Sequence, residues 1–355
     1  MSQSVWRSLL LAGLFAILCH AAAQAQGASD DINCRTAYPA GFTPADKGVF
    51  PSPKYPRAAL NDWSEGFALL EFTVTAQGEV RDVDVVDAMG AKEFVTTSVK
   101  ALLAHRFKPA MRGGAPVAQP LHTFQISYMF SDSKPEADHS EFIETFKRAR
   151  RQLQDNQPDH AIVTLNRMFL WRLNLYEQTL GSYLLALAYV QKQDGESALY
   201  HANHAVGEGV SYLDDATRTA ARELIVKLLA QTGNVAGALC AINDLPPASR
   251  PSFARLDMDL RNALASDSPL VSDGKILKQP LTDQPPTWRR KLMRGKFSFA
   301  NINGEVASFR LACVATSFDS AVNMETQWTV PEGAGSCFIR VTGAAGATFK
   351  FVEER

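Results

Sequence analysis

The sequence of 355 residues lacks an excess of charge of either sign, because 36 lysines and arginines stand against 37 aspartates and glutamates. The net charge of -1 offers no electrostatic footprint for nucleic acid and no polybasic arm for a membrane surface. The sequence also has no apolar run of the roughly 18 residues that span a bilayer comfortably. Hydrophobic residues make up 46%, as in ordinary globular proteins. We therefore expect a multi-domain protein that does not bind nucleic acid.

Motifs that carry catalysis are missing as well. There is no Gly-x-Ser-x-Gly elbow, phosphate loop, His-Glu-x-x-His helix or dinucleotide fingerprint. One spacing could hold a metal, since His201, His204 and Glu208 would share one helix face. The alternative is that the two histidines are exposed beside packing alanines, and we prefer it. We expect no catalytic residue, no cofactor and no metal, and hence no enzyme.

The first 25 residues have the pattern of a secretory signal peptide. Arg7 is followed by the short apolar stretch Leu9 to Cys19 and then by Ala23-Gln24-Ala25, the small residues of a cleavage site. We predict cleavage between Ala25 and Gln26 and a periplasmic location. Two alternatives stay open, an uncleaved anchor in the inner membrane and lipidation at Cys19.

Cysteine is scarce, with five residues in the chain, and cleavage of the signal would leave four. Disulfides are the usual fate of cysteines in exported proteins. Cys313 and Cys337 are the nearest neighbours, and we predict a bond between them. Cys34 and Cys240 are the remaining pair, either bonded to each other or present as unpaired structural thiols.

Composition and periodicity divide the chain into segments and indicate a multi-domain α+β protein. The predicted segments are a signal peptide (1–25), a flexible leader (26–50), a strand-strand-helix-strand domain (51–130), a polar linker (131–139), a helical repeat block (140–265), a Pro-rich linker (266–290) and a small antiparallel β domain (291–355).

The 51–130 segment alternates apolar and polar residues in three places. Ala68, Leu70, Phe72 and Val74 alternate along one strand, and Val80–Val86 follows a Gln-Gly break as a second. Residues 92–106 have the period of a helix. Further alternation over residues 123–130 then predicts a half-buried third strand.

This segment resembles the TonB C-terminal domain family, and the resemblance is carried by motif residues spread along it. These are Tyr55, Pro56, Gly66, Gly78, Phe107 and Pro109, with the strand Ile126-Ser127-Tyr128-Met129-Phe130 at the end. The resemblance implies a small α+β domain that reaches outer-membrane receptors by adding a receptor strand to its own sheet edge.

The residues that match the family's edge strand are Phe124, Gln125, Ile126, Ser127, Tyr128, Met129 and Phe130. Implied partners are proteins or peptides of the cell envelope, such as N-terminal segments of outer-membrane receptors. The sequence departs from energy transducers in its long chain after the domain and in Leu60, where a glutamine is typical. Three functions remain: an exported interaction module, which we prefer, a TonB-type transducer with an uncleaved anchor as the alternative, and an enzyme whose catalytic residues match no motif that we recognise.

The 140–265 block resembles tetratricopeptide repeats. Ala161, Ala198 and Ala238 each lie near the start of a second helix, at a spacing close to that repeat's period. Small residues allow paired helices to approach closely. The resemblance implies a short solenoid that binds a peptide or protein. In the last block, Asn303-Gly304 between apolar runs predicts a hairpin.

Overall fold

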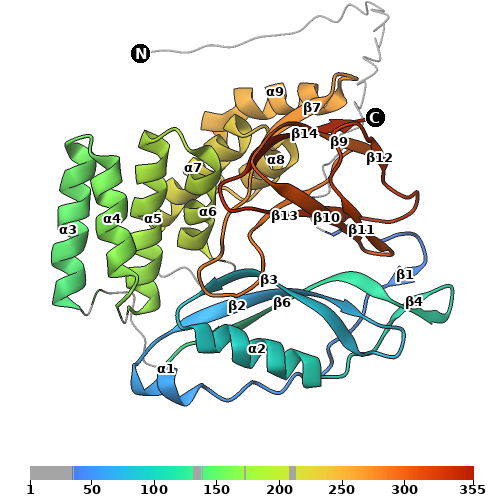
Figure 1. Ribbon diagram of the computed structural model, residues 1–355, viewed down its shortest axis with the longest axis horizontal. Helices are drawn as coiled ribbons and strands as arrows, with labels where there is room; N and C mark the ends of the chain where they lie inside the picture. The colour runs from blue at the N-terminus through green and yellow to red at the C-terminus, as the bar shows by residue number, and fades with distance from the viewer. Residues whose placement is uncertain (1–33, 35, 131–136, 138, 172, 208–212) are drawn as a thin grey trace, which may run out of the picture. The chain divides into compact units, whose positions relative to one another are not determined.

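The computed structural model describes residue 34 and residues 36–130, 137, 139–171, 173–207 and 213–355 (Figure 1). The predicted cleavage site at Ala25 and Gln26 and most of the polar linker 131–139 lie outside the described residues. Within the described part of the chain, no helix is both long enough and apolar enough to cross a membrane.

The 51–130 segment forms the expected strand-strand-helix-strand domain. Its elements are α1 (Arg57–Asn61), β2 (Gly66–Val74), β3 (Val80–Met89), α2 (Lys92–Ala104), β4 (Ala110–Arg112), β5 (Ala115–Val117) and β6 (Gln119–Tyr128). The strands β3, β2 and β6 make an antiparallel sheet in that order. The alternating residues Leu70 and Phe72 are buried with Leu102 of α2, which packs across one face of the sheet.

The predicted leader is ordered where the structure describes it. Its strand β1 (Phe42–Thr43) pairs with β4, and the Asp46 and Lys108 backbones bond to each other beyond that pair. Cys34 forms a disulfide with Cys240. The expectation of a loose leader is therefore wrong for residues 36–50, because long-range backbone pairing fixes a segment whose local composition indicates a loop.

The described residues of the 140–265 block form helices joined by turns, as the periodicity predicts. Its helices are α3 (Ser140–Gln154), α4 (Pro158–Met168), α5 (Leu175–Gln191), α6 (Gly195–Val206), α7 (Asp215–Gln231), α8 (Val235–Asn243) and α9 (Ala254–Ala265), with a 3-10 turn η1 (Arg250–Phe253). Ala161, Ala198 and Ala238 are each the fourth residue of α4, α6 and α8 and are fully buried. Each of these alanines thus lies at the same position of its helix, with its side chain packed inside the helical block.

The C-terminal block is a pair of four-stranded antiparallel sheets. One sheet has the order β11-β10-β13-β8 and the other β12-β9-β14-β7. The strands are β7 (Leu270–Lys275), β8 (Thr287–Lys291), β9 (Lys296–Asn303), β10 (Val306–Cys313), β11 (Ser317–Ala321), β12 (Trp328–Thr329), β13 (Cys337–Gly343) and β14 (Thr348–Glu354). A cluster of aromatic side chains, including Phe297, Phe309 and Phe351, fills the core between them.

The two local signals in this block are confirmed. Asn303-Gly304 closes the turn between β9 and β10. Cys313 and Cys337 lie opposite each other on β10 and β13 and form the predicted disulfide.

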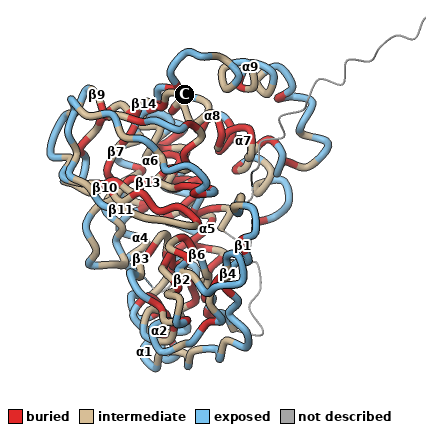
Figure 2. Tube along the Cα trace, turned by 90° about the vertical axis from the view of Figure 1, so that its right-hand side faces the viewer, coloured by how far each residue is buried: buried red, intermediate tan, exposed pale blue. Residues whose placement is uncertain are grey.

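The Pro-rich segment 266–290 differs from its prediction as a linker, because it contains β7 and nearly all of β8. Its prolines lie at the ends of these strands or in the loop between them, where a missing N–H breaks no ladder. Pro269 directly precedes β7, and Pro286 directly precedes β8. Figure 2 shows buried stretches in the sheets and in inner helices such as α7, whereas nearly all of α9 is exposed or half-buried.

Candidate peptide-binding edge

The last strand of the N-terminal domain, β6, lies at an edge of its sheet. It pairs with β2 from Gly66 opposite Tyr128 to Val74 opposite Gln119, and no other strand of the described residues pairs with it. The strand begins five residues earlier than the predicted Phe124 and ends at Tyr128. Met129 and Phe130 follow it, and Phe130 donates its N–H to Glu65 Oε1 (2.9 Å).

The apolar side of β6 is covered as the alternation predicts. Phe124, Ile126 and Tyr128 pack in a cluster with Phe94 of α2. The rings of Phe94 and Tyr128 stack at 4.5 Å, and the Tyr128 hydroxyl bonds to Ser98 Oγ at 2.9 Å. Burial raises the pKa of Tyr128, so the hydroxyl stays neutral. This face fixes the strand from one side and leaves its polar side chains on the other.

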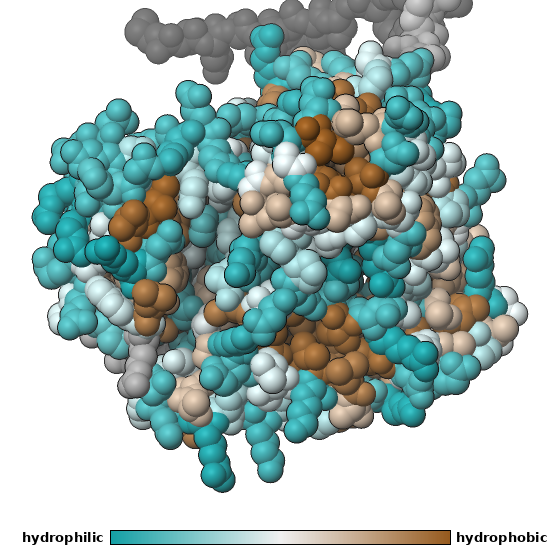
Figure 3. All heavy atoms as spheres, in the orientation of Figure 1, coloured by the Kyte–Doolittle hydropathy of each residue, from teal (hydrophilic) through white to brown (hydrophobic). Residues whose placement is uncertain are grey.

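The opposite edge of the sheet, β3, is closed by the chain itself. The side-chain amide of Gln284, in the loop between β7 and β8, accepts from Val85 N–H (2.9 Å) and donates to Val83 O (3.1 Å). Gln279 donates to Val86 O (2.7 Å) from the same loop. These amides substitute for the backbone of a neighbouring strand. Leu281 of the same loop packs against the core of the domain. Figure 3 shows an apolar patch near α2.

The bonds made by Gln284 also show which backbone groups of β6 point out of the sheet. Along an antiparallel strand, successive residues direct their N–H and C=O to opposite neighbours. Val85 bonds outward, so its partner Leu70 bonds toward β6, where it faces Phe124. Phe124 therefore bonds inward, and the residues on either side of it bond outward. The outward set is Thr123, Gln125 and Ser127.

The described part of the leader does not occupy this edge. Residues 42–43 pair with β4 instead. Lys47 lies over the ring of Phe124 at 4.5 Å, and Phe50 packs edge-on against the same ring at 4.9 Å. Both contacts are with the apolar face of β6. No backbone hydrogen bond from residues 36–50 reaches the outward N–H groups of Thr123, Gln125 and Ser127.

The motif residues hold the sheet and its loops together. Tyr55 packs on both Phe94 and Tyr128, and Pro56 precedes α1. Gly66 and Gly78 approach other backbone too closely for any side chain, since a Cβ would lie 2.0 Å from Met89 O and 2.1 Å from Phe107 O. Phe107 bonds back to Gly78 through its N–H (2.9 Å). Pro109 directly precedes β4.

The second face of the sheet is acidic and contacts basic side chains from the other two blocks. The pairs are Glu71 with Arg289, Asp82 with Arg310, Asp84 with Arg340, and Asp87 with His204. Three of the basic partners come from β8, β10 and β13, and the fourth comes from α6. This face therefore packs on the protein itself, and sequence periodicity carries no signal for such pairing.

The histidines considered as metal ligands have other roles. His204 is buried, with Nε2 2.6 Å from Asp87 Oδ1, and His201 stacks on Tyr189 at 5.3 Å. Our preferred expectation that both are exposed is wrong, because α6 packs against the sheet. Glu208 lies outside the described residues. No group of three potential metal ligands occurs among the residues that the structure describes.

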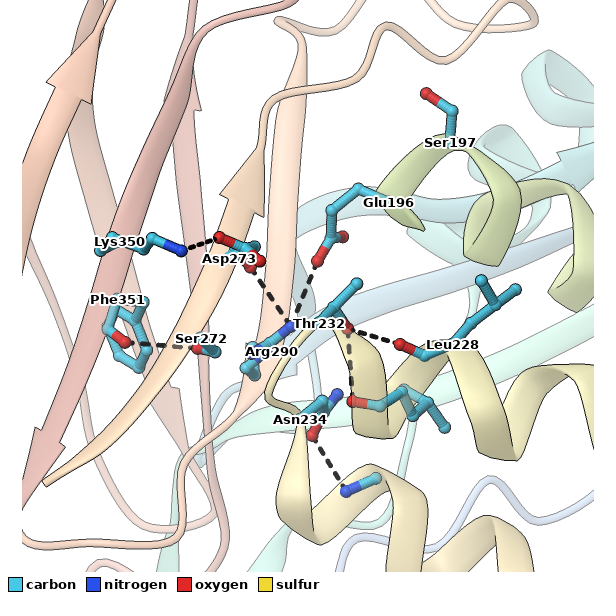
Figure 4. Close-up of polar contacts among 12 residues, drawn as sticks. Glu196, Ser197, Leu228, Thr232, Asn234, Ser272, Asp273, Arg290, Lys350 and Phe351 are labelled. Carbon is cyan, nitrogen blue, oxygen red and sulfur yellow. Dashed lines mark hydrogen bonds and ion pairs between the residues drawn. The ribbon is translucent and has the colours of Figure 1, made fainter. Parts of the chain in front are cut away.

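The strand β8 contains the basic run Trp288 to Lys291, and none of these four residues is exposed. Arg290 of β8 is 4% exposed and pairs with Glu196 of α6 at 3.3 Å (Figure 4). Burial raises the pKa of Glu196 to about 7. The nearby cavity of about 320 Å³ is lined by Asp273 and Lys350, which pair with each other. The Arg290–Glu196 pair thus joins α6 to β8, whereas the Asp273–Lys350 pair joins β7 to β14.

The comparisons with known proteins concern the N-terminal domain. Residues 51–130 match the family described as Gram-negative bacterial TonB protein C-terminal. The solution NMR structure of the TonB CTD of Pseudomonas aeruginosa is similar, with 25% sequence identity and a TM-score of 0.23, over 27% of this chain and 92% of that chain. No curated protein matches. Residues 51–130 are thus similar to the C-terminal domain of TonB proteins.

Proposed function

We propose that the N-terminal domain binds an extended peptide by adding it as a further strand to the outer edge of β6. The observation that carries the proposal is the contrast between the two sheet edges. Gln284 and Gln279 close the β3 edge, whereas no strand of the described residues lies beside the outward groups of Thr123, Gln125 and Ser127 on β6. Unpaired edge groups are a template for another strand, and main-chain bonds to them supply affinity.

The partner we propose is a protein of the cell envelope, with N-terminal segments of outer-membrane receptors as the first candidates. The family match of residues 51–130 supports a protein partner. Export to the periplasm with loss of residues 1–25 fits two disulfides, which persist in oxidising compartments. Within this proposal the protein is a binding module without catalytic residues or cofactors.

The helical block would serve as a scaffold for a second protein, in keeping with its equally placed alanines on α4, α6 and α8. The alternative is an energy transducer for transport across the outer membrane, held by an uncleaved N-terminal anchor. N-terminal sequencing of the protein from a periplasmic extract separates the two. A chain that starts at Gln26 supports the exported module, and a membrane-bound chain that starts at Met1 supports the transducer.

Strand addition is tested by replacing an outward N–H. Ser127→Pro removes one outward donor and leaves the inward bonds of Ile126 and Tyr128 to β2 intact. The control Ser127→Ala keeps the N–H and removes only the hydroxyl. Receptor N-terminal peptides titrated into the mature protein should bind Ser127→Ala like the wild type and Ser127→Pro at least about 5-fold more weakly, the effect of roughly one hydrogen bond.

The melting midpoint of each variant shows whether it remains folded. Equal peptide affinity in a folded Ser127→Pro protein would contradict pairing along β6. If the proline variant proves unfolded, protection of the Gln125 amide from exchange by peptide in the wild type decides the question, because this amide points outward in every folded molecule.

A further inference from the structure

A cavity of about 370 Å³ lies against the polar face of the sheet, beside the edge strand. Its floor is formed by Phe67 and Leu69 of β2, and α6 contributes Tyr200 and Asn203 to the opposite wall. Gln125 of β6 lines the cavity on the side of the sheet edge. The isolated sheet could not form this space, since α6 belongs to the helical block.

The side-chain oxygen of Gln125 is a hydrogen-bond acceptor in the lining of this cavity. Its Nε2 donates to Ser127 Oγ at 3.1 Å. Its Oε1 is buried and has no hydrogen-bond partner among the residues that the structure describes. A buried acceptor without a partner costs free energy, and a donor brought to it recovers that cost. Asp87, Tyr200 and Asn203 bring the other polar groups of the lining, and the Asp87 carboxylate is already held by His204.

The position of Gln125 on the strand connects this cavity to the proposed peptide. The backbone of Gln125 bonds outward, so a strand added to β6 would place one residue directly opposite it. Side chains of directly opposite residues lie on the same face of a sheet, with Cβ atoms about 4.5–5.5 Å apart. The side chain of that peptide residue would therefore stand beside Gln125, within reach of the cavity.

We infer that this cavity is the specificity pocket of the edge and takes a long hydrogen-bond-donating side chain of the bound strand, of the glutamine type. The inference rests on the proposed strand addition. Phe67 and Leu69 offer apolar surface to the methylene stem, and the Gln125 oxygen accepts from the amide. A carboxylate is rejected, because it has no proton to donate and lies near Asp87.

The probes are capped ten-residue peptides built from threonine and valine with a lysine at each end. One interior residue is glutamine, leucine, alanine or glutamate, and it is moved through every interior position in turn, so that the binding register need not be known. Binding to the full mature protein is measured by fluorescence anisotropy. At one position glutamine should bind about 2- to 10-fold tighter than leucine, the range expected for one hydrogen bond, and glutamate should bind worst.

The Gln125→Leu variant should abolish the preference for glutamine over leucine at that position. Its melting midpoint confirms that the variant is folded. Suppose that peptides bind and that Ser127→Pro weakens their binding. If no peptide position then prefers glutamine, or if the preference survives in Gln125→Leu, the pocket is refuted while strand addition stands. If no peptide of the set binds, strand addition and the pocket fall together.

Discussion

The amide of Gln284 should stabilise the closed edge of the N-terminal sheet, and its removal has a magnitude that the structure sets. Gln284→Ala deletes the two bonds to Val85 N–H and Val83 O. Each bond contributes about 0.5–1.5 kcal/mol net, so the variant should lose about 1–3 kcal/mol of the free energy of unfolding. We expect the bond to Val85 N–H to lie at the upper end of the range for one hydrogen bond, because Val85 is 7% exposed and water reaches its N–H poorly.

The matched control is the adjacent Asp283→Ala, in the same loop. Asp283 pairs with Lys92 at 2.9 Å, but the two side chains are 89% and 57% exposed. Exposed ion pairs contribute at most about 1 kcal/mol and often nothing measurable, so this variant should unfold like the wild type.

Urea unfolding of the mature protein gives the change in stability, and hydrogen exchange followed by mass spectrometry locates it. The peptide that contains Val83 and Val85 should exchange faster in Gln284→Ala and at the wild-type rate in Asp283→Ala. Equal exchange in both variants would refute the view that Gln284 closes this edge. An opened β3 edge should also favour self-association, as unpaired edges do.

Four further outcomes follow from buried groups. Ala198→Trp should overpack a helix contact and lower stability by about 1–3 kcal/mol, and an unchanged melting midpoint would show that the site is loose. Replacing Cys313 and Cys337 by serine should cost on the order of 3 kcal/mol in urea unfolding; a loss below about 1 kcal/mol would contradict the assigned role of this bond. The raised pKa of Glu196 means that the folded state binds its proton more tightly, so stability should fall between about pH 4.5 and 7 by roughly 3 kcal/mol, and Glu196→Gln should flatten that slope. Burial lowers the pKa of His201 to about 3, so the folded state favours the neutral imidazole. The stability that this side chain contributes is therefore present above pH 6.5 and is lost as the pH falls toward 3. If the free energy of unfolding falls with acid in His201→Gln as steeply as in the wild type, this prediction is contradicted.

Local patterns in the sequence predict the elements whose faces are set by their own residues. Phe124, Ile126 and Tyr128 alternate because one side of β6 faces a helix, and this alternation indicates both the strand and its buried face. The alanines of the helical block and the Asn303-Gly304 turn are equally local signals.

Long-range contacts explain what the sequence does not reveal. Gln284 lies among prolines that indicate a loop, and its role arises only because that loop reaches β3 from far along the chain. The same holds for His204, whose burial depends on Asp87 of another block. The cavity beside Gln125 needs both the sheet and α6, so neither segment alone carries a sign of it.

The central claim is that β6 receives a strand, and amide exchange at single residues tests it most directly. A receptor N-terminal peptide is added to the isotopically labelled mature protein, and protection is followed by NMR. Pairing along β6 predicts that the amides of Thr123, Gln125 and Ser127 gain protection, while those of Phe124 and Ile126, which already bond to β2, change little. Protection confined to β3 or to α2, with these three amides unchanged under saturating peptide, would contradict the account.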